Sequence, residues 1–90
     1  MRIRWAPEAA DDFERLIERI RQDNPAAARE VAEILFERVE ALKAFPHLGR
    51  IGRLEGSREL VFTPLPYVAV YRLRGETIQI SRIYHGAQNR

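Results

Sequence analysis

The side chains best suited to chemistry gather in the last third of the sequence. Arg82, Tyr84 and His85 lie within one short segment, and Arg58 begins an apolar run upstream. An arginine guanidinium group binds phosphate or carboxylate through paired hydrogen bonds, and a histidine imidazole titrates near neutral pH. Together these residues could hold an anionic target, with His85 as a proton donor or acceptor.

The same residues could instead serve only the fold. Arg58, Arg72 and Arg82 fall at the ends of apolar runs. There they could close the edge of the core by pairing with Glu59 or with helix carboxylates. We favour this role for Arg72 and the anion-binding role for Arg82. A histidine at a strand end, such as His85, more often makes a terminating hydrogen bond than it transfers a proton.

The net charge of +2 conceals an asymmetry between the two halves of the chain. Residues 1–44 hold eight basic and ten acidic residues, whereas residues 45–90 hold seven Arg and three Glu. The second half therefore suits an anionic partner, either a nucleic acid or an acidic protein. Arg50 and Arg53 form a basic loop with three glycines in the segment 47–56, which lacks the spacing and the Lys-Ser/Thr pair of a P-loop.

Composition argues against several kinds of protein. The chain has no cysteine, and His47 has no second ligand close by in the sequence, so we expect no metal and no cofactor. No apolar run approaches the roughly 20 residues of a membrane span, and the N-terminal segment lacks the apolar stretch of a secretory signal. We expect one domain over residues 1–90, in the cytoplasm and away from membranes.

Three runs rich in β-branched and aromatic residues predict a three-stranded antiparallel meander. Two prolines interrupt the first gap, and Arg74-Gly75-Glu76 fills the second. A further strand is expected at Arg2–Trp5, which must pair with the meander to satisfy its backbone groups. The three runs are Arg58–Thr63, Tyr67–Leu73 and Thr77–Tyr84.

Two amphipathic helices are predicted between the first strand and the meander. The first opens at Ala6-Pro7-Glu8 and keeps a helical apolar spacing to Gln22-Asp23. Asn24 caps the second helix and Pro25 begins it, and Phe45-Pro46 ends it. The connection is short, so the helices form an antiparallel hairpin. The fold class is therefore α+β, an antiparallel sheet packed on a two-helix hairpin in the order βααβββ.

Side-chain alternation predicts the two faces of the sheet. We place the even-numbered apolar residues, from Leu60 to Ile80, on the face that packs against the helices. The odd-numbered face is then poorly covered or covered by a partner, unless both faces are buried within the monomer. The predicted contacts with a target or partner are Tyr67, Tyr71, Arg72 and Ile83.

These features also resemble a known family. Within the order βααβββ the chain carries the segments FPHLGRIGR, RELV, PYVAVYR and ISRIYHGAQ. The whole chain resembles the RelE/ParE superfamily of bacterial toxins from type II toxin–antitoxin modules. The resemblance implies growth arrest by the free toxin and a cognate antitoxin encoded by a neighbouring gene. Contact with DNA would be made only through the antitoxin, which would cover the half-apolar sheet face.

The resemblance leaves the activity open. RelE-like members cut mRNA on the ribosome without a metal, whereas ParE-like members inhibit DNA gyrase and are not known as nucleases. If the chain is a nuclease, its candidate catalytic residues are Arg58, Arg82, Tyr84 and His85. A third alternative is a degenerate toxin fold that acts only as a binding module.

Departures from the RelE-like pattern favour the ParE-like, plasmid-stabilisation branch. RelE-like nucleases carry lysines on the second strand and an arginine after an aromatic of the third, whereas the aligned positions hold Glu59, Val61 and Val68. A carboxylate would repel a dianionic transition state. His85 aligns with histidines in both branches and does not discriminate. We therefore predict a gyrase inhibitor without enzymatic activity, with a ribosome-dependent endoribonuclease as the alternative.

Overall fold

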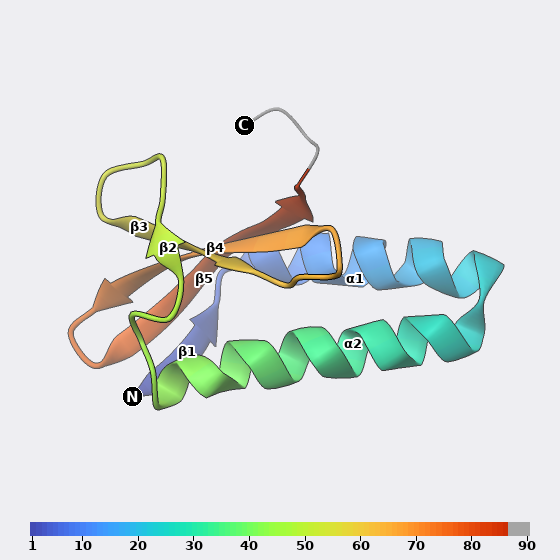
Figure 1. The fold of residues 1–90 in the computed structure, drawn as a ribbon, viewed down its shortest axis with the longest axis horizontal. Coiled ribbons are helices and arrows are strands. Elements are labelled where there is room, and N and C mark those ends of the chain that lie inside the picture. Colours follow the sequence, from blue (N-terminus) through green and yellow to red (C-terminus); the bar gives the residue numbers. More distant parts are fainter. Residues whose placement is uncertain (87–90) are drawn as a thin grey trace.

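The computed structural model describes residues 1–86, in which two helices pack on one face of a five-stranded sheet (Figure 1). Ala87 and Gln88, which end the segment ISRIYHGAQ, lie outside the described residues. The helices are α1 (Pro7–Asp23) and α2 (Pro25–Glu40), followed by a short 3-10 helix, η1 (Ala41–Lys43). The strands are β1 (Arg2–Trp5), β2 (Arg50–Ile51), β3 (Ser57–Val61), β4 (Tyr67–Arg74) and β5 (Thr77–His85).

Asn24 both ends α1 and begins α2, as its position before Pro25 predicts. Its N–H donates to the Ile20 carbonyl at 2.8 Å, and its side-chain Oδ1 accepts the Ala27 N–H at 3.1 Å. Pro25 follows at the first helical position, where its missing N–H costs nothing. The second helix ends earlier than predicted, at Glu40, because the chain tightens into η1 before it reaches Phe45.

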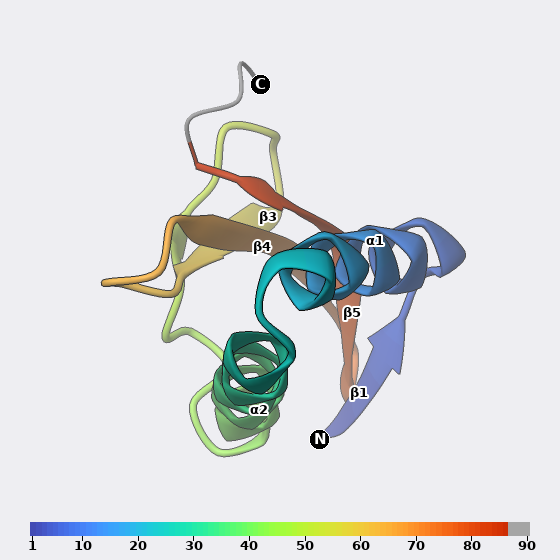
Figure 2. The same ribbon diagram turned by 90° about the vertical axis from the view of Figure 1, so that its right-hand side faces the viewer.

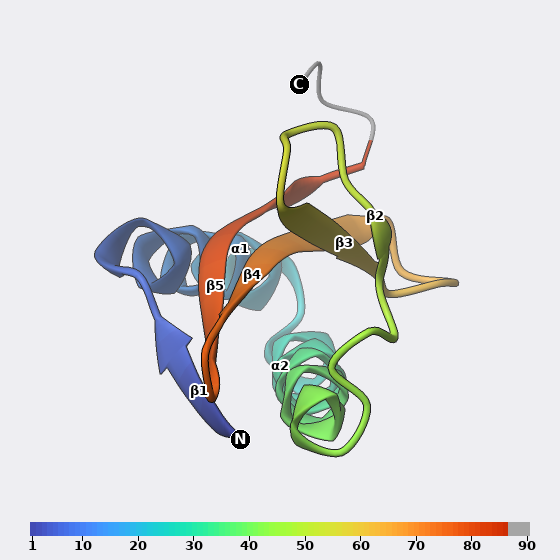
Figure 3. The ribbon, with the colours of Figure 1, turned by 90° about the vertical axis from the view of Figure 1, so that its left-hand side faces the viewer.

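The sheet is mixed, which corrects the wholly antiparallel sheet of the prediction. Its strand order is β1-β5-β4-β3-β2, and β1 runs parallel to β5, with Arg2 opposite Thr77 and Trp5 opposite Ile80. The two helices return the chain to the end of the sheet at which β1 starts, so β3 runs in the direction of β1. The antiparallel pairs β3–β4 and β4–β5 then give β5 the same direction. Figure 3 shows β1 beside β5 at the sheet edge. The short strand β2 was not predicted, whereas the α+β class and the order of the main elements are confirmed.

The predicted assignment of sheet faces is wrong in β4 and at the end of β5. The hairpin turn pairs Arg74 with Thr77, so odd positions of β4 share a face with even positions of β5. The register then shifts, because Ser81 has no partner between the pairs Tyr71–Ile80 and Val70–Arg82. Such a bulge moves the next side chains to the other face.

The core therefore combines both parities on the helix side of the sheet. Seen along the helices, α1 and α2 lie on the same side of the strands (Figure 2). Neither helix of residues 1–86 is long and apolar enough to span a membrane. The sheet contributes Leu60, Ala69, Tyr71, Ile78, Ile80 and Ile83 to the buried core, and Phe62 joins them just after β3. Leu35, Val39 and Leu42 meet these residues from α2 and η1.

Candidate functional site

Arg82 is bound to the first helix through Asp12. The Arg82 Nε and Nη2 atoms donate to the two carboxylate oxygens of Asp12 at 2.8 and 3.1 Å, and the Ile83 N–H donates to the same carboxylate at 3.0 Å. β1 pairs with β5 only as far as Ile80, so no strand of residues 1–86 pairs with this edge of β5 beyond Ile80. The Asp12 carboxylate satisfies the edge N–H that a strand would otherwise bind.

The ion pair changes the ionisation of both groups. Burial alone would raise the pKa of the Asp12 carboxyl, but hydrogen bonds from Arg82 and Ile83, with the charges of Arg82 and Arg15, hold that pKa below its ordinary value. The hydrogen bond and charge of Asp12 raise the pKa of the Arg82 guanidinium. Asp12 and Arg82 therefore stay charged together at neutral pH.

A shallow hollow lies beside this ion pair, between α1 and the end of β5. Its cavity volume is about 250 Å³. Tyr67 and His85 meet edge to face at its rim, with ring centroids 5.7 Å apart. The hollow is lined by Asp12, Arg15, Leu16, Arg19, Tyr67, Arg82, Ile83, Tyr84 and His85. It thus brings together three of the four predicted catalytic candidates.

The fourth candidate, Arg58, lies elsewhere. It pairs with Tyr71 across the sheet, whereas His85 pairs with Tyr67, so the two positions are separated by four residues of β4, roughly 13 Å at strand spacing. The Arg58 Nη1 atom donates to the Gly49 carbonyl at 2.7 Å. Arg58 therefore supports the loop before β2 and does not join the hollow.

Tyr71 supports the same loop from inside the core. Its hydroxyl donates to the Pro46 carbonyl at 2.8 Å and accepts the Gly49 N–H at 2.9 Å. Burial raises the pKa of this hydroxyl, against the opposing effects of the Gly49 hydrogen bond and the Arg58 charge. Tyr71 is fully buried and Ile83 is nearly so, which corrects their predicted place on an uncovered sheet face.

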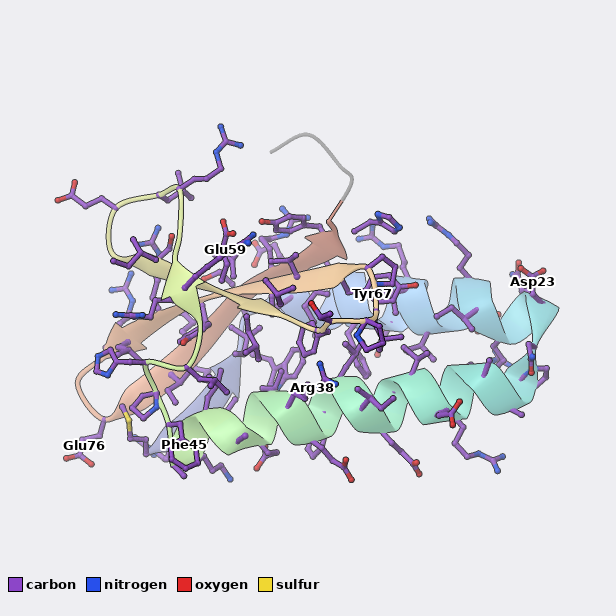
Figure 4. The ribbon with its side chains drawn as sticks, in the orientation of Figure 1. Asp23, Arg38, Phe45, Glu59, Tyr67 and Glu76 are labelled. Carbon is purple, nitrogen blue, oxygen red and sulfur yellow. The ribbon has the colours of Figure 1, made fainter. Side chains whose placement is uncertain are left out.

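The opposite face of the sheet holds a buried carboxylate. Glu59 is 5% exposed, and its Oε1 accepts hydrogen bonds from the Arg50 Nε and Nη2 atoms at 3.1 and 2.8 Å. Figure 4 shows Glu59 on the side of the sheet away from the helices. Arg50 of the predicted basic loop is thus half of an ion pair, while Arg53 is exposed in the same loop.

Arg72 also supports a loop. Its Nη1 atom donates to the Glu55 carbonyl at 2.7 Å, and the Gly52 N–H donates to the Ser57 carbonyl at 2.9 Å. Arg72 therefore has a role in the fold, although its acceptor is a loop carbonyl and not the predicted Glu59 or a helix carboxylate. A contact of Arg72 or Tyr67 with a target or partner stays a prediction.

Sequence reasoning missed the contribution of α1. No role was predicted for Asp12, Arg15 or Arg19, which line the hollow from this helix. The spacing of these two arginines is i, i+4, which puts both on one side of a helix and could have identified them. Among residues 1–86, no three His, Asp or Glu side chains are grouped as a metal site would require.

Comparison with known proteins gives matches over almost the whole chain. The family model described as the ParE toxin of type II toxin–antitoxin systems, parDE, matches residues 3–90. A protein of Sinorhizobium fredii named "Putative toxin Y4kP" is 34% identical over 97% of this chain and 90% of its own length. Toxin RelE1 of Caulobacter vibrioides is 32% identical over 91% of this chain and 89% of its own.

Solved structures have the same fold. A chain of the chromosomal ParDE toxin–antitoxin system from P. aeruginosa superposes with a TM-score of 0.85 at 28% identity, over 94% of this chain and 95% of the other. The YoeB dimer of Staphylococcus aureus gives a TM-score of 0.64 at 17% identity, over 94% of this chain and 97% of the other. The second likeness extends to the fold alone.

Proposed function

The chain belongs to the ParE toxin family of type II toxin–antitoxin systems within the RelE/ParE superfamily, and from this premise we propose that it arrests growth by inhibiting DNA gyrase. In this proposal residues 1–90 form one toxin domain that acts in the cytoplasm. A cognate antitoxin, encoded by a neighbouring gene, binds the toxin and neutralises it. Contact with DNA is then made by the antitoxin, as the resemblance implies.

The observation that carries the proposal is that the arginines at the strand ends already donate hydrogen bonds to acceptors within the protein. Cleavage of RNA needs cations that are available to stabilise charge developing on the scissile phosphate. Arg58 and Arg72 are held by loop carbonyls, and Arg82 is held by Asp12. A substrate phosphate would have to displace these acceptors, which favours a toxin that acts by binding and not by catalysis.

The buried carboxylate of Glu59 supports the same conclusion. By the resemblance, this position corresponds to a lysine of RelE-like nucleases. Glu59 is buried and its carboxylate is paired with Arg50. The positive charge of Arg50 is therefore already bound and is not open to a phosphate on this face of the sheet. A negative charge there would also repel the transition state of phosphodiester cleavage.

Ribosome-dependent mRNA cleavage is the second candidate function. It is favoured by one arrangement, the grouping of Arg82, Tyr84 and His85 around a hollow that also holds Arg15 and Arg19. One relative of this chain also carries the name Toxin RelE1. A degenerate toxin fold that only binds a partner is the third.

Two assays on the purified toxin separate these functions. In a gyrase supercoiling assay we expect inhibition by the toxin and its relief by the antitoxin. In a translation-coupled reaction with the same preparation, the mRNA should remain intact. Intact supercoiling together with cleaved ribosome-bound mRNA would contradict the proposal, and normal growth under strong, verified expression would favour the degenerate fold.

A further inference from the structure

Arg15 and Arg19 form a pair of exposed positive charges on α1, at the hollow beside β5. At i, i+4 spacing, the two side chains lie about one helical turn apart, roughly 6 Å between their Cβ atoms. Neither makes an ion pair or a side-chain hydrogen bond with any residue of the described range 1–86. The charge of Arg15 helps to lower the pKa of Asp12, but neither guanidinium is held in place by an ion pair, so both can still bind a ligand.

The remaining charges of the hollow do not cancel this pair. Within residues 1–86, Asp12 is the one acidic residue that lines the hollow. Its carboxylate is already held at two points by Arg82 and at a third by the Ile83 N–H. The hollow therefore keeps a positive charge on its α1 side. This charge is the reverse of α1 as a whole, where acidic residues outnumber basic ones.

The positive patch is also short. On the helix, Asp11 and Asp23 continue the row of Arg15 and Arg19 by one turn in each direction. Figure 4 shows Asp23 at the tip of the helical hairpin. A nucleic acid strand needs a continuous track of cations for its phosphates, whereas two arginines bounded by carboxylates suit one or two isolated acidic groups.

The rest of the lining adds an apolar surface next to the two arginines. Leu16, Tyr67 and Ile83 contribute to the hollow, and Tyr67 is held against His85. With about 250 Å³ the hollow is smaller than the roughly 300–1,000 Å³ of small-molecule sites. It has room for a few side chains of a peptide that crosses the surface.

We propose that this hollow binds a short acidic segment of a protein partner, with carboxylates on Arg15 and Arg19 and an apolar side chain between them on Leu16 and Tyr67. Paired guanidinium–carboxylate hydrogen bonds give such a contact its strength and its geometry. The inference rests on the proposed function, in which a protein antitoxin binds the toxin and neutralises it. Under that function the acidic segment belongs to the antitoxin.

The test uses the purified full chain and a defined probe, the capped peptide Gly-Glu-Leu-Glu-Gly, titrated by NMR on the ¹⁵N-labelled protein. We expect chemical-shift changes on α1 around Arg15 and Arg19 and on the neighbouring end of β5. The double variant Arg15→Gln/Arg19→Gln should bind at least about tenfold more weakly, because hydrogen bonds between charged groups are lost. The peptide Gly-Gln-Leu-Gln-Gly should bind as weakly to the wild type.

A matched control removes the same charge elsewhere. Arg29 on α2 and Arg74 at the end of β4 are both exposed and do not line the hollow. The double variant Arg29→Gln/Arg74→Gln should keep the wild-type affinity within about twofold, as exposed charges beyond the site are screened. Thermal unfolding of both variants verifies that each is folded.

Three results would overturn the inference. The first is equal binding by the hollow variant and the control variant, and the second is a set of shift changes that lies away from α1 and β5. The third is tighter binding of a twelve-base deoxythymidine strand than of the acidic peptide, lost in the hollow variant. The assay contains neither gyrase nor antitoxin, so its failure is distinguishable from a failure to inhibit supercoiling.

Discussion

Asp12 and Arg82 form a two-point ion pair that joins the first helix to the last strand, with N–O distances of 2.8 and 3.1 Å. The same carboxylate accepts the Ile83 N–H, so one side chain of α1 binds both the backbone and a side chain of β5. The pair lies directly after the point at which β1 stops pairing with β5. It therefore closes the part of the sheet edge that β1 leaves open.

The first prediction concerns acid stability. The pKa of Asp12 is lowered from 3.8 in the folded chain, so its contribution to stability is present above that pH and is lost as the pH falls through the lower folded value. Asp12→Asn should reduce the free energy of unfolding by about 1–2 kcal/mol at pH 7, because the charged hydrogen bonds to Arg82 are lost. The loss is no larger because Arg82 is exposed and its charge is partly screened by solvent. Urea unfolding between pH 7 and pH 2.5 should show the wild type and the variant converging below about pH 4.

Asp11→Asn is the control for this effect. Asp11 precedes Asp12 and is exposed, without a described ion pair within residues 1–86. Its replacement should change the free energy of unfolding by less than about 0.5 kcal/mol. A constant difference between Asp12→Asn and wild type over the whole pH range would contradict the role of the carboxylate charge.

The second prediction concerns the hydroxyl of Tyr71. Tyr71→Phe removes the donor to the partly buried Pro46 carbonyl and the acceptor of the buried Gly49 N–H. We expect a loss of about 1–3 kcal/mol in the free energy of unfolding, measured by urea denaturation. Tyr67→Phe is the matched control, since Tyr67 is only partly buried, and it should cost less. Equal losses would show that the Tyr71 hydroxyl contributes no more to stability than the hydroxyl of the partly buried Tyr67.

The third prediction concerns the approach of the loop to the sheet at Gly49. A Cβ atom at this position would lie 2.7 Å from the Tyr71 ring and 2.8 Å from the Glu59 carbonyl oxygen. In a thermal unfolding experiment, Gly49→Ala should therefore reduce the free energy of unfolding by about 1–3 kcal/mol, as substitutions that overpack a core do. At Gly86 the nearest atom would be 3.4 Å away, so Gly86→Ala should be close to neutral in the same thermal unfolding experiment. A neutral Gly49→Ala would mean that the loop moves away without cost.

The fourth prediction concerns His85, on the proposed function. If the toxin acts by binding gyrase, no proton has to move, and His85→Gln should arrest growth as the wild type does. Loss of toxicity in His85→Gln, together with mRNA cleavage by the wild type, would make His85 a general acid or base. Arg82→Ala tests the neighbouring group and should weaken inhibition by no more than one interface hot spot, about 2–4 kcal/mol.

Local sequence signals predicted the elements well. Asn24 and Pro25 define the helix connection because capping depends on residues within one turn of each other. Pro7 and the apolar spacing of α1 act over the same short range, and the meander follows from runs that Pro64, Pro66 and Gly75 separate. These features need no knowledge of the remainder of the chain.

The faces of the sheet and the partners of the arginines depended on longer-range geometry. The turn between two strands decides whether their even-numbered residues share a face of the sheet. The Arg74–Thr77 pairing places odd positions of β4 on the same face as even positions of β5. The unpaired Ser81 reverses this relationship within β5. Likewise, Arg82 meets an acceptor 70 positions away in sequence, which neither charge nor spacing near residue 82 could identify.

The parallel pairing of β1 with β5 also sets the time at which the toxin can become complete during its synthesis. Arg2–Trp5 is made early, but its described strand partner is Thr77–Ile80, which leaves the ribosome only after both helices and the rest of the meander. A strand without its neighbour cannot satisfy its backbone groups. The growing chain can form its helical hairpin first, but the finished sheet, and any activity that depends on it, must wait until β5 has been translated.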